Sequence, residues 1–165
     1  MDPSPSQRPS KMVRKFLSGG KAWDAEPGAN LSAFSKEMYF FYGSLMDSST
    51  LSKVLDLKDR PLLNPAWITG YRCMLWGPYP ALIDGPQGMD VRGVVYEVQS
   101  PEEERRLQEY ESDNYRVASC VIKLDDGSGR MVPGRTFKWN GDPAVLREGH
   151  FDMKDWQLDS LERNV

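Results

Sequence analysis

Cysteine and histidine are scarce in this sequence. Its 165 residues include two cysteines, Cys73 and Cys120, and one histidine, His150. Disulfide frameworks and metal sites use more ligands at closer spacing, so we expect no metal and two reduced cysteines packed in a core. No motif links His150 to a cysteine or to Ser44, which argues against a nucleophile triad and favours a surface or packing role.

Long apolar runs and an excess of positive charge are missing as well. No run approaches the roughly 20 apolar residues of a membrane-spanning helix, and the N-terminus, Met1-Asp2-Pro3-Ser4-Pro5, lacks the apolar stretch of a secretory signal. The net charge is −3 and the pI is about 5.3. We therefore expect a cytoplasmic protein with neither nucleic acid nor membrane as a partner. The oligomeric state stays open.

The first 36 residues differ in composition from the rest. They carry Pro3, Pro5, Pro9 and Pro27, with serine and glycine between them and few apolar residues. Such a stretch buries too little surface to offset its ordering entropy. We expect residues 1–36 to form a disordered or loosely attached tail and residues 37–165 to form a single domain.

Strand-like and helix-like patterns alternate after the tail. An aromatic run closed by Gly43 predicts a buried strand, and Ser100-Pro101-Glu102-Glu103 predicts a helix start with a capping box. A last helix at 152–163 would dock through Met153, Trp156, Leu158 and Leu161. The other expected elements are a helix capped by one of 47–49 and strands at 66–75, 81–83, 91–98, 115–124 and 131–139, with hairpin turns at 84–88 and 125–129. This order favours an α+β fold, a mixed sheet partly closed into a small β-barrel with flanking helices.

The turn Tyr42-Gly43-Ser44-Leu45 is the first candidate site. A buried strand ends there in glycine and small polar residues, and a helix begins just beyond. This arrangement points successive backbone N–H groups outward, where they can bind a carboxylate or an oxyanion. The alternative is a plain strand-to-helix turn with Gly43 present only for its backbone freedom.

Glu111 is the second candidate. It lies between Tyr110 and Tyr115, where a capped helix ends and a strand begins. A carboxyl group partly buried among aromatic residues has a raised pKa and can act as a general acid or base. The alternative is a solvated acid in a loop, because most glutamates are exposed.

Three motifs together resemble the γ-glutamylcyclotransferase-like superfamily, in its branch named after avirulence-induced (AIG2-like) plant proteins. Phe40–Leu45 matches an aromatic strand closed by Tyr-Gly-Ser/Thr-Leu, and Val91–Val98 matches a Gly-x-Val/Leu-Tyr-x-Val strand. Leu107–Arg116 matches a Leu-Asp-x-Phe/Tyr-Glu-Gly-x-x-Tyr-x-Arg pattern, with Glu109 and Ser112 where aspartate and glycine are common. The resemblance covers roughly Glu37 to Trp139.

The resemblance implies a small mixed barrel with a cavity at its mouth and a cofactor-independent cyclotransferase, an acyl-transfer or cyclising-lyase type of enzyme. It would convert a γ-glutamyl amide to 5-oxoproline and a free amine. By position, Glu111 matches the catalytic glutamate, Tyr42, Gly43, Ser44 and Leu45 match the substrate-binding loop, and Tyr115 matches a tyrosine that lines or supports the site. Two alternatives stay open: a non-catalytic ligand-binding or regulatory module, and a tailoring enzyme for other amide or lactam chemistry.

Overall fold

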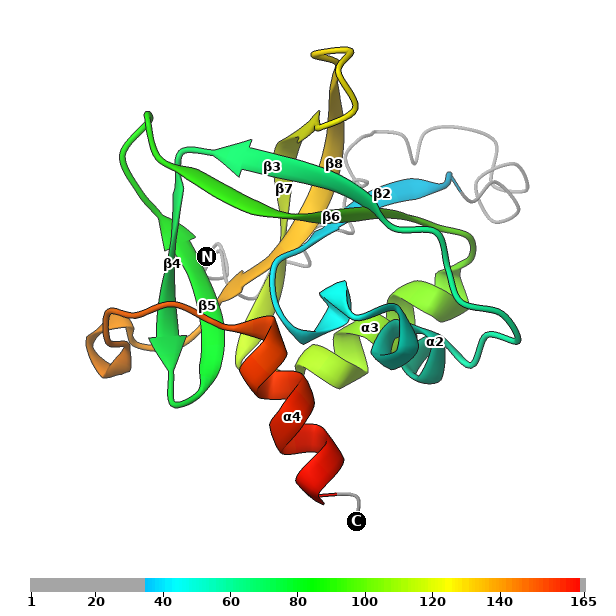
Figure 1. Ribbon diagram of the computed structural model, residues 1–165. Coiled ribbons are helices and arrows are strands. Elements are labelled where there is room, and N and C mark those ends of the chain that lie inside the picture. Colours follow the sequence, from blue (N-terminus) through cyan, green and yellow to red (C-terminus); the bar gives the residue numbers. More distant parts are fainter. Residues whose placement is uncertain (1–34, 164–165) are drawn as a thin grey trace, which may run out of the picture.

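A closed five-stranded barrel forms the body of the molecule (Figure 1). The computed structural model describes residues 35–163, so the expected tail lies outside the described residues except for Ser35 and Lys36, which are exposed. The strands follow the order β2-β6-β3-β7-β8 around the barrel. Their bounds are β2 Glu37–Phe41, β3 Asn64–Thr69, β6 Asp90–Val98, β7 Tyr115–Leu124 and β8 Met131–Trp139.

The barrel is mixed because its first and last strands meet in parallel. β2 pairs with β6 antiparallel over its whole length and with β8 through Tyr39 and Arg135. The other pairs are antiparallel, and the β7–β8 hairpin turns at 125–129 as expected. The fold class predicted from the sequence is confirmed.

A separate hairpin and several helices surround the barrel. The hairpin consists of β4 (Tyr71–Trp76) and β5 (Tyr79–Asp84). The helices are η2 Ser44–Met46, α2 Ser48–Leu55, α3 Pro101–Glu111, η3 Pro143–Val145 and α4 Met153–Arg163. Figure 1 shows α2 and α3 together at one end of the barrel, with α4 between them and the hairpin. No helix within residues 35–163 is long and apolar enough to cross a membrane.

Two expectations about the strands are wrong. The expected strand 66–75 is broken at Gly70, whose φ of +92° ends β3, so that β4 leaves the barrel. The turn 84–88 does not join a hairpin either, because β5 pairs with β4 while β6 pairs with β2 and β3. The hairpin instead turns at Gly77-Pro78, a two-residue connection suited to antiparallel strands.

The helix starts follow their capping side chains. Asp47 caps α2 by accepting from the Thr50 N–H at 3.0 Å, and Ser100 caps α3 by accepting from the Glu103 N–H at 3.2 Å. The Glu103 carboxylate reaches past Ser100 and accepts from the Gln99 N–H at 2.9 Å. The capping box is therefore displaced by one residue from its usual form.

Alternate residues of β2 face two different cores, as the two-residue period of a strand requires. Phe40 points into the barrel with Ile68, Val95 and Ile122. Tyr39 and Phe41 point the other way, into a core that includes Leu51 of α2 and Leu107 of α3. Both faces are buried, which explains the unbroken aromatic run in the sequence.

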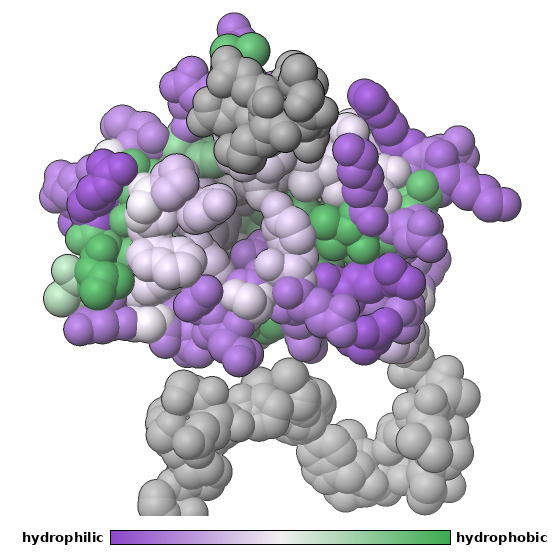
Figure 2. Space-filling view, turned by 90° about the horizontal axis from the view of Figure 1, so that it is seen from below, coloured by the Kyte–Doolittle hydropathy of each residue, from purple (hydrophilic) through white to green (hydrophobic). Residues whose placement is uncertain are grey.

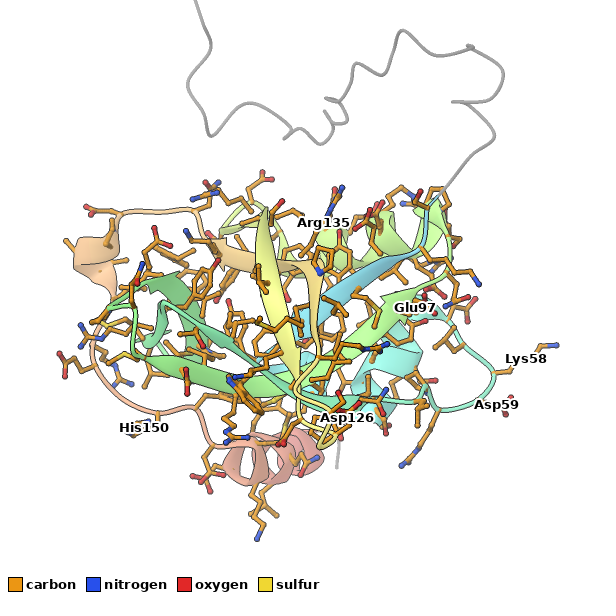
Figure 3. The ribbon with its side chains drawn as sticks, turned by 90° about the horizontal axis from the view of Figure 1, so that it is seen from above. Lys58, Asp59, Glu97, Asp126, Arg135 and His150 are labelled. Carbon is orange, nitrogen blue, oxygen red and sulfur yellow. The ribbon has the colours of Figure 1, made fainter. Side chains whose placement is uncertain are left out.

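The structure also places the cysteines, the single histidine and the last helix. Cys120 is buried and Cys73 partly buried, both as free thiols, and His150 is exposed and lies at the periphery of the molecule (Figure 3). In α4 the expected docking of Leu158 is wrong, since 59% of it is exposed. The neighbouring Gln157 contacts the domain instead, donating to Asp47 Oδ1 at 2.8 Å.

Candidate active site

A cavity of about 290 Å³ opens at one end of the barrel. Figure 2 views this end of the molecule, which is hollowed near its centre. All the site residues predicted from the sequence line the cavity: Tyr42, Gly43, Ser44, Leu45, Glu111 and Tyr115. The other lining residues are Phe40, Phe41, Trp76, Tyr79, Pro80, Tyr110, Ser112, Asn114 and Phe137.

Segments far apart in the sequence meet around this cavity. The chain leaves β2 at Tyr42 and turns into η2, α3 ends at Glu111, and β7 begins at Tyr115. The β4–β5 hairpin supplies Trp76, Tyr79 and Pro80. These hairpin residues were not predicted from the sequence. The pattern Trp76-Gly77-Pro78-Tyr79-Pro80 indicates an aromatic turn, but nothing local shows that this turn folds over the end of β2.

Glu111 is the one charged side chain among the described residues that line the cavity. It is half-buried, and burial raises its pKa from 4.5 to about 7. No donor within residues 35–163 makes a hydrogen bond to its carboxyl group at the distances that define the other bonds of the site. The carboxyl group is therefore free to exchange a proton with a ligand near neutral pH.

The backbone conformation after Glu111 explains why glycine is common at the position that Ser112 occupies in this chain. Ser112 ends α3 with φ +65° and ψ −175°, and its N–H donates to the Gln108 carbonyl at 2.9 Å. A residue with a side chain rarely adopts this conformation, which glycine adopts at little cost. The glycine common at this position in the family is thus accounted for, and Ser112 carries local strain beside Glu111.

Tyr42 and Tyr115 use their hydroxyl groups to hold the wall of the cavity. The Tyr42 hydroxyl donates to the Phe137 carbonyl at 2.6 Å and accepts from the Leu82 N–H at 3.2 Å. The Tyr115 hydroxyl donates to the Pro80 carbonyl at 2.8 Å. Burial, and then the nearby Glu111 charge, raise the pKa of both tyrosines, so both stay protonated. These bonds fasten β5 of the hairpin to the barrel at the site.

The turn 43–45 lines the cavity and contains backbone donors without a partner among the described residues. Ser44 and Leu45 begin η2, and the first N–H groups of a helix have no partner within it. No described residue accepts from either N–H, while the Ser44 Oγ shares a 2.7 Å hydrogen bond with the Tyr110 hydroxyl. These donors suit an anionic ligand group.

Gly43 is required for a steric reason. Its φ of −127° is open to any residue, but a Cβ atom there would lie 2.8 Å from Pro80 Cγ. The turn and the hairpin therefore approach each other more closely than a side chain at residue 43 allows. The alternative raised from the sequence, that Gly43 is present only for its backbone freedom, therefore does not account for this glycine.

Comparison with known proteins agrees with this geometry. The family model "Gamma-glutamyl cyclotransferase, AIG2-like" matches residues 39–158. No curated protein matches the chain. Among solved structures, the Arabidopsis thaliana protein At3g28950.1 is 24% identical, with a TM-score of 0.60 over 80% of this chain and 79% of that one.

Two further structures share the fold at lower identity. A mouse AIG2-like protein is 18% identical, with a TM-score of 0.54 over 72% of this chain and 89% of that one. A yeast gamma-glutamyl cyclotransferase specific to glutathione is 16% identical, with a TM-score of 0.53 over 79% of this chain and 86% of that one. With the family model spanning the barrel and most of α4, this chain belongs to the AIG2-like gamma-glutamyl cyclotransferase family.

Proposed function

We propose that the protein converts a γ-glutamyl amide to 5-oxoproline and a free amine, with Glu111 as the general acid/base. The observation that carries the proposal is the setting of Glu111: a carboxyl group with a pKa near 7, without a hydrogen-bond partner among the described residues, in a cavity also lined by backbone donors. The yeast protein named above acts on glutathione, a γ-glutamyl compound, which supports the substrate class.

The reaction is an intramolecular acyl transfer. The α-amine of the glutamyl group attacks its own γ-carbonyl carbon, the new C–N bond closes a five-membered ring, and the bond from that carbon to the amine nitrogen breaks. Glu111 takes a proton from the α-ammonium group and returns one to the departing nitrogen. The cavity holds the substrate in a folded conformation, so proximity replaces a protein nucleophile.

The donors at 43–45 have two possible tasks in this scheme. They can stabilise the oxyanion that develops on the γ-carbonyl oxygen, or hold the α-carboxylate of the substrate. Either task uses the Ser44 and Leu45 N–H groups.

The expected cytoplasmic location of the protein stays a prediction.

Replacing Glu111 by glutamine tests the proposal. Glutamine keeps the shape of the side chain but cannot accept the proton, and general acid–base catalysis contributes about 10²–10⁴-fold. We expect Glu111→Gln to lower the rate of 5-oxoproline release from γ-glutamyl amides at least about 100-fold, with little change in substrate affinity. In the wild type, kcat/KM should rise with pH through the pKa of about 7, and this limb should vanish in the variant.

Glu109→Gln is the matched control. Glu109 lies on the same helix, is exposed and pairs with Arg105 at the surface. Its substitution should leave turnover unchanged. Equal turnover in folded Glu111→Gln would exclude Glu111 as the acid/base, and ligand binding without any turnover in the wild type would favour a non-catalytic binding module.

A further inference from the structure

The rim of the cavity is aromatic and unusually exposed. Tyr79 and Tyr110 are 48% and 43% exposed, whereas Phe41 and Leu45, which line the same cavity, are 3% and 2% exposed. The exposed fraction of the lining side chains therefore increases from the floor of the cavity to its mouth. Exposed aromatic side chains beside a cavity offer a large contact area to whatever enters it.

The aromatic rim is held in place from behind. Trp76 and Tyr79 are opposite residues of the β4–β5 hairpin, with ring centroids 6.3 Å apart. Trp76 packs against Trp139 at 4.9 Å, and Trp139 meets the edge of Tyr115 at 5.5 Å. The Trp139 indole N–H donates to the Asp142 carbonyl at 3.2 Å. Trp76 and Tyr79 thus form a supported surface, the rim pair, rather than two loose side chains.

Positive charge is absent from the described lining of the cavity. At the hairpin turn, Arg147 donates to the Gly77 carbonyl at 3.1 Å and is not among the lining residues. At the far end of the hairpin, Lys138 is paired with Asp84. A substrate with a carboxylate on its amine portion would therefore meet no lining cation and would lie near the ionisable Glu111.

The cavity is small, and the two parts of the substrate, the glutamyl group and the amine portion, occupy different regions of it. At about 290 Å³ it lies at the small end of ligand pockets, which are about 300–1,000 Å³. We place the glutamyl group against Glu111 and the 43–45 donors, next to the buried floor that includes Phe41 and Leu45. The substituent on the amide nitrogen then extends toward the mouth, where Tyr79 and Tyr110 are exposed and Trp76 is half-buried.

We propose that the rim pair, Trp76 and Tyr79, is a binding subsite for the leaving amine and that it selects γ-glutamyl amides of uncharged, aromatic amines over γ-glutamyl amino acids. The expected preference in turnover rests on the proposed function, whereas the expected preference in binding does not. Stacking on the rim pair binds the aromatic substituent, and because no cation lies among the lining residues that the structure describes, an amino-acid carboxylate is left unpaired.

The test compares γ-glutamyl-phenethylamide with γ-glutamylglycine and with γ-glutamylputrescine, whose free end is cationic. We expect kcat/KM to be at least about tenfold higher for the phenethylamide, in line with roughly 1.4 kcal/mol from aromatic contact. Tyr79→Ala should reduce this preference below about threefold, mainly by lowering kcat/KM for the phenethylamide. Leu62→Ala is the control, since Leu62 is 78% exposed and lies outside the cavity lining.

Binding separates the subsite from the reaction. In Glu111→Gln, whose turnover should be at least about 100-fold slower, calorimetry should show tighter binding of the phenethylamide than of γ-glutamylglycine, and Tyr79→Ala should abolish the difference. If this binding preference is found but the wild type releases no 5-oxoproline, the subsite is supported and the proposed function is rejected. Equal or tighter binding of the glycine or putrescine compound, or a preference that survives Tyr79→Ala, would overturn the subsite.

Discussion

At Glu111, protein stability and catalysis make opposite demands. The cavity that raises its pKa to about 7 also disfavours the ionised form that a base requires. Tyr42 and Tyr115 face it with protonated hydroxyl groups already committed to backbone carbonyls. Within residues 35–163, no opposite charge lines the cavity to offset the desolvation of Glu111. Ionising Glu111 therefore costs folding free energy.

This conflict predicts a pH-dependent stability difference. The unfolded carboxyl group titrates near 4.5 and the folded one near 7, so the folded state holds the extra proton between these values. Its stabilising contribution is complete below about pH 4.5 and is lost as the pH rises through 7, by at most about 3 kcal/mol. Glu111→Gln should therefore be more stable than the wild type at pH 8, and the difference should shrink toward pH 5.

Urea unfolding at pH 5, 6.5 and 8 measures this difference. Glu109→Gln is the control, because it removes an exposed carboxylate from the same helix. A stability difference between Glu111→Gln and the wild type that does not change with pH would mean that Glu111 titrates as an ordinary solvated acid.

The residues that line the cavity could be predicted from the sequence where they belong to a local motif. They could not be predicted where they reach the cavity through a contact between distant segments. Tyr42–Leu45, Glu111 and Tyr115 lie in two short motifs and all line the cavity. Trp76 and Tyr79 belong to neither motif. They reach the site because the Tyr42 and Tyr115 hydroxyl groups fasten β5 to the barrel, a contact between residues 40 and 35 positions apart in the chain.

Among the elements, α3 has the most direct effect on the site because Glu111 is its last residue. The helix is anchored at its other end by Glu103, which is buried and accepts from the Tyr96 hydroxyl and the Gln99 N–H, both at 2.9 Å. Leu107, fully buried, packs between these two ends. The position of Glu111 thus depends on how firmly the start of α3 is held.

Removing the Glu103 carboxylate should loosen the helix. Glu103→Ala leaves the buried Tyr96 hydroxyl and the Gln99 N–H without an acceptor, and we expect a loss of about 2–3 kcal/mol in the free energy of unfolding. Glu102→Ala on the same turn removes only exposed pairs with Arg105 and Arg106, which solvent screens, so its effect on the free energy of unfolding should be much smaller. Urea denaturation of the two variants compares these costs directly. Equal losses would show that Glu103 is no more than a surface charge.

The same element scale explains which predictions failed. The helix starts followed from Ser100 and Asp47, whose capping bonds are local. The break between β3 and β4 depends on Gly70, which looks like any glycine in a strand until its φ of +92° is known. The pairing of β5 with β4 rather than β6 depends on which strands close the barrel, and no short pattern encodes that choice.

For the whole molecule, closure of the barrel requires β2 to fit between β6 and β8. Each of these neighbours presents a glycine to it. A Cβ atom at Gly93 of β6 would clash with the Phe41 carbonyl oxygen, and one at Gly134 of β8 would lie 2.6 Å from the Met38 carbonyl oxygen. Both contacts are with backbone, which cannot rotate away as a side chain can. The glycine of the Gly-x-Val/Leu-Tyr motif is thus explained by close approach of two strands.

These two glycines give a prediction about the barrel as a unit. Gly93→Ala and Gly134→Ala should each force β2 away from a neighbouring strand, at a cost of about 1–3 kcal/mol or more in the free energy of unfolding. Because β2 continues into the 43–45 turn, both variants should also weaken ligand binding at the cavity, although neither residue lines it. Gly88→Ala is the control, since a Cβ atom there meets nothing within 4 Å. Thermal unfolding and ligand titration of the three variants measure both effects. If Gly93→Ala and Gly134→Ala unfold at the same temperature as Gly88→Ala, then β2 has room to move, and barrel closure does not set the position of the site.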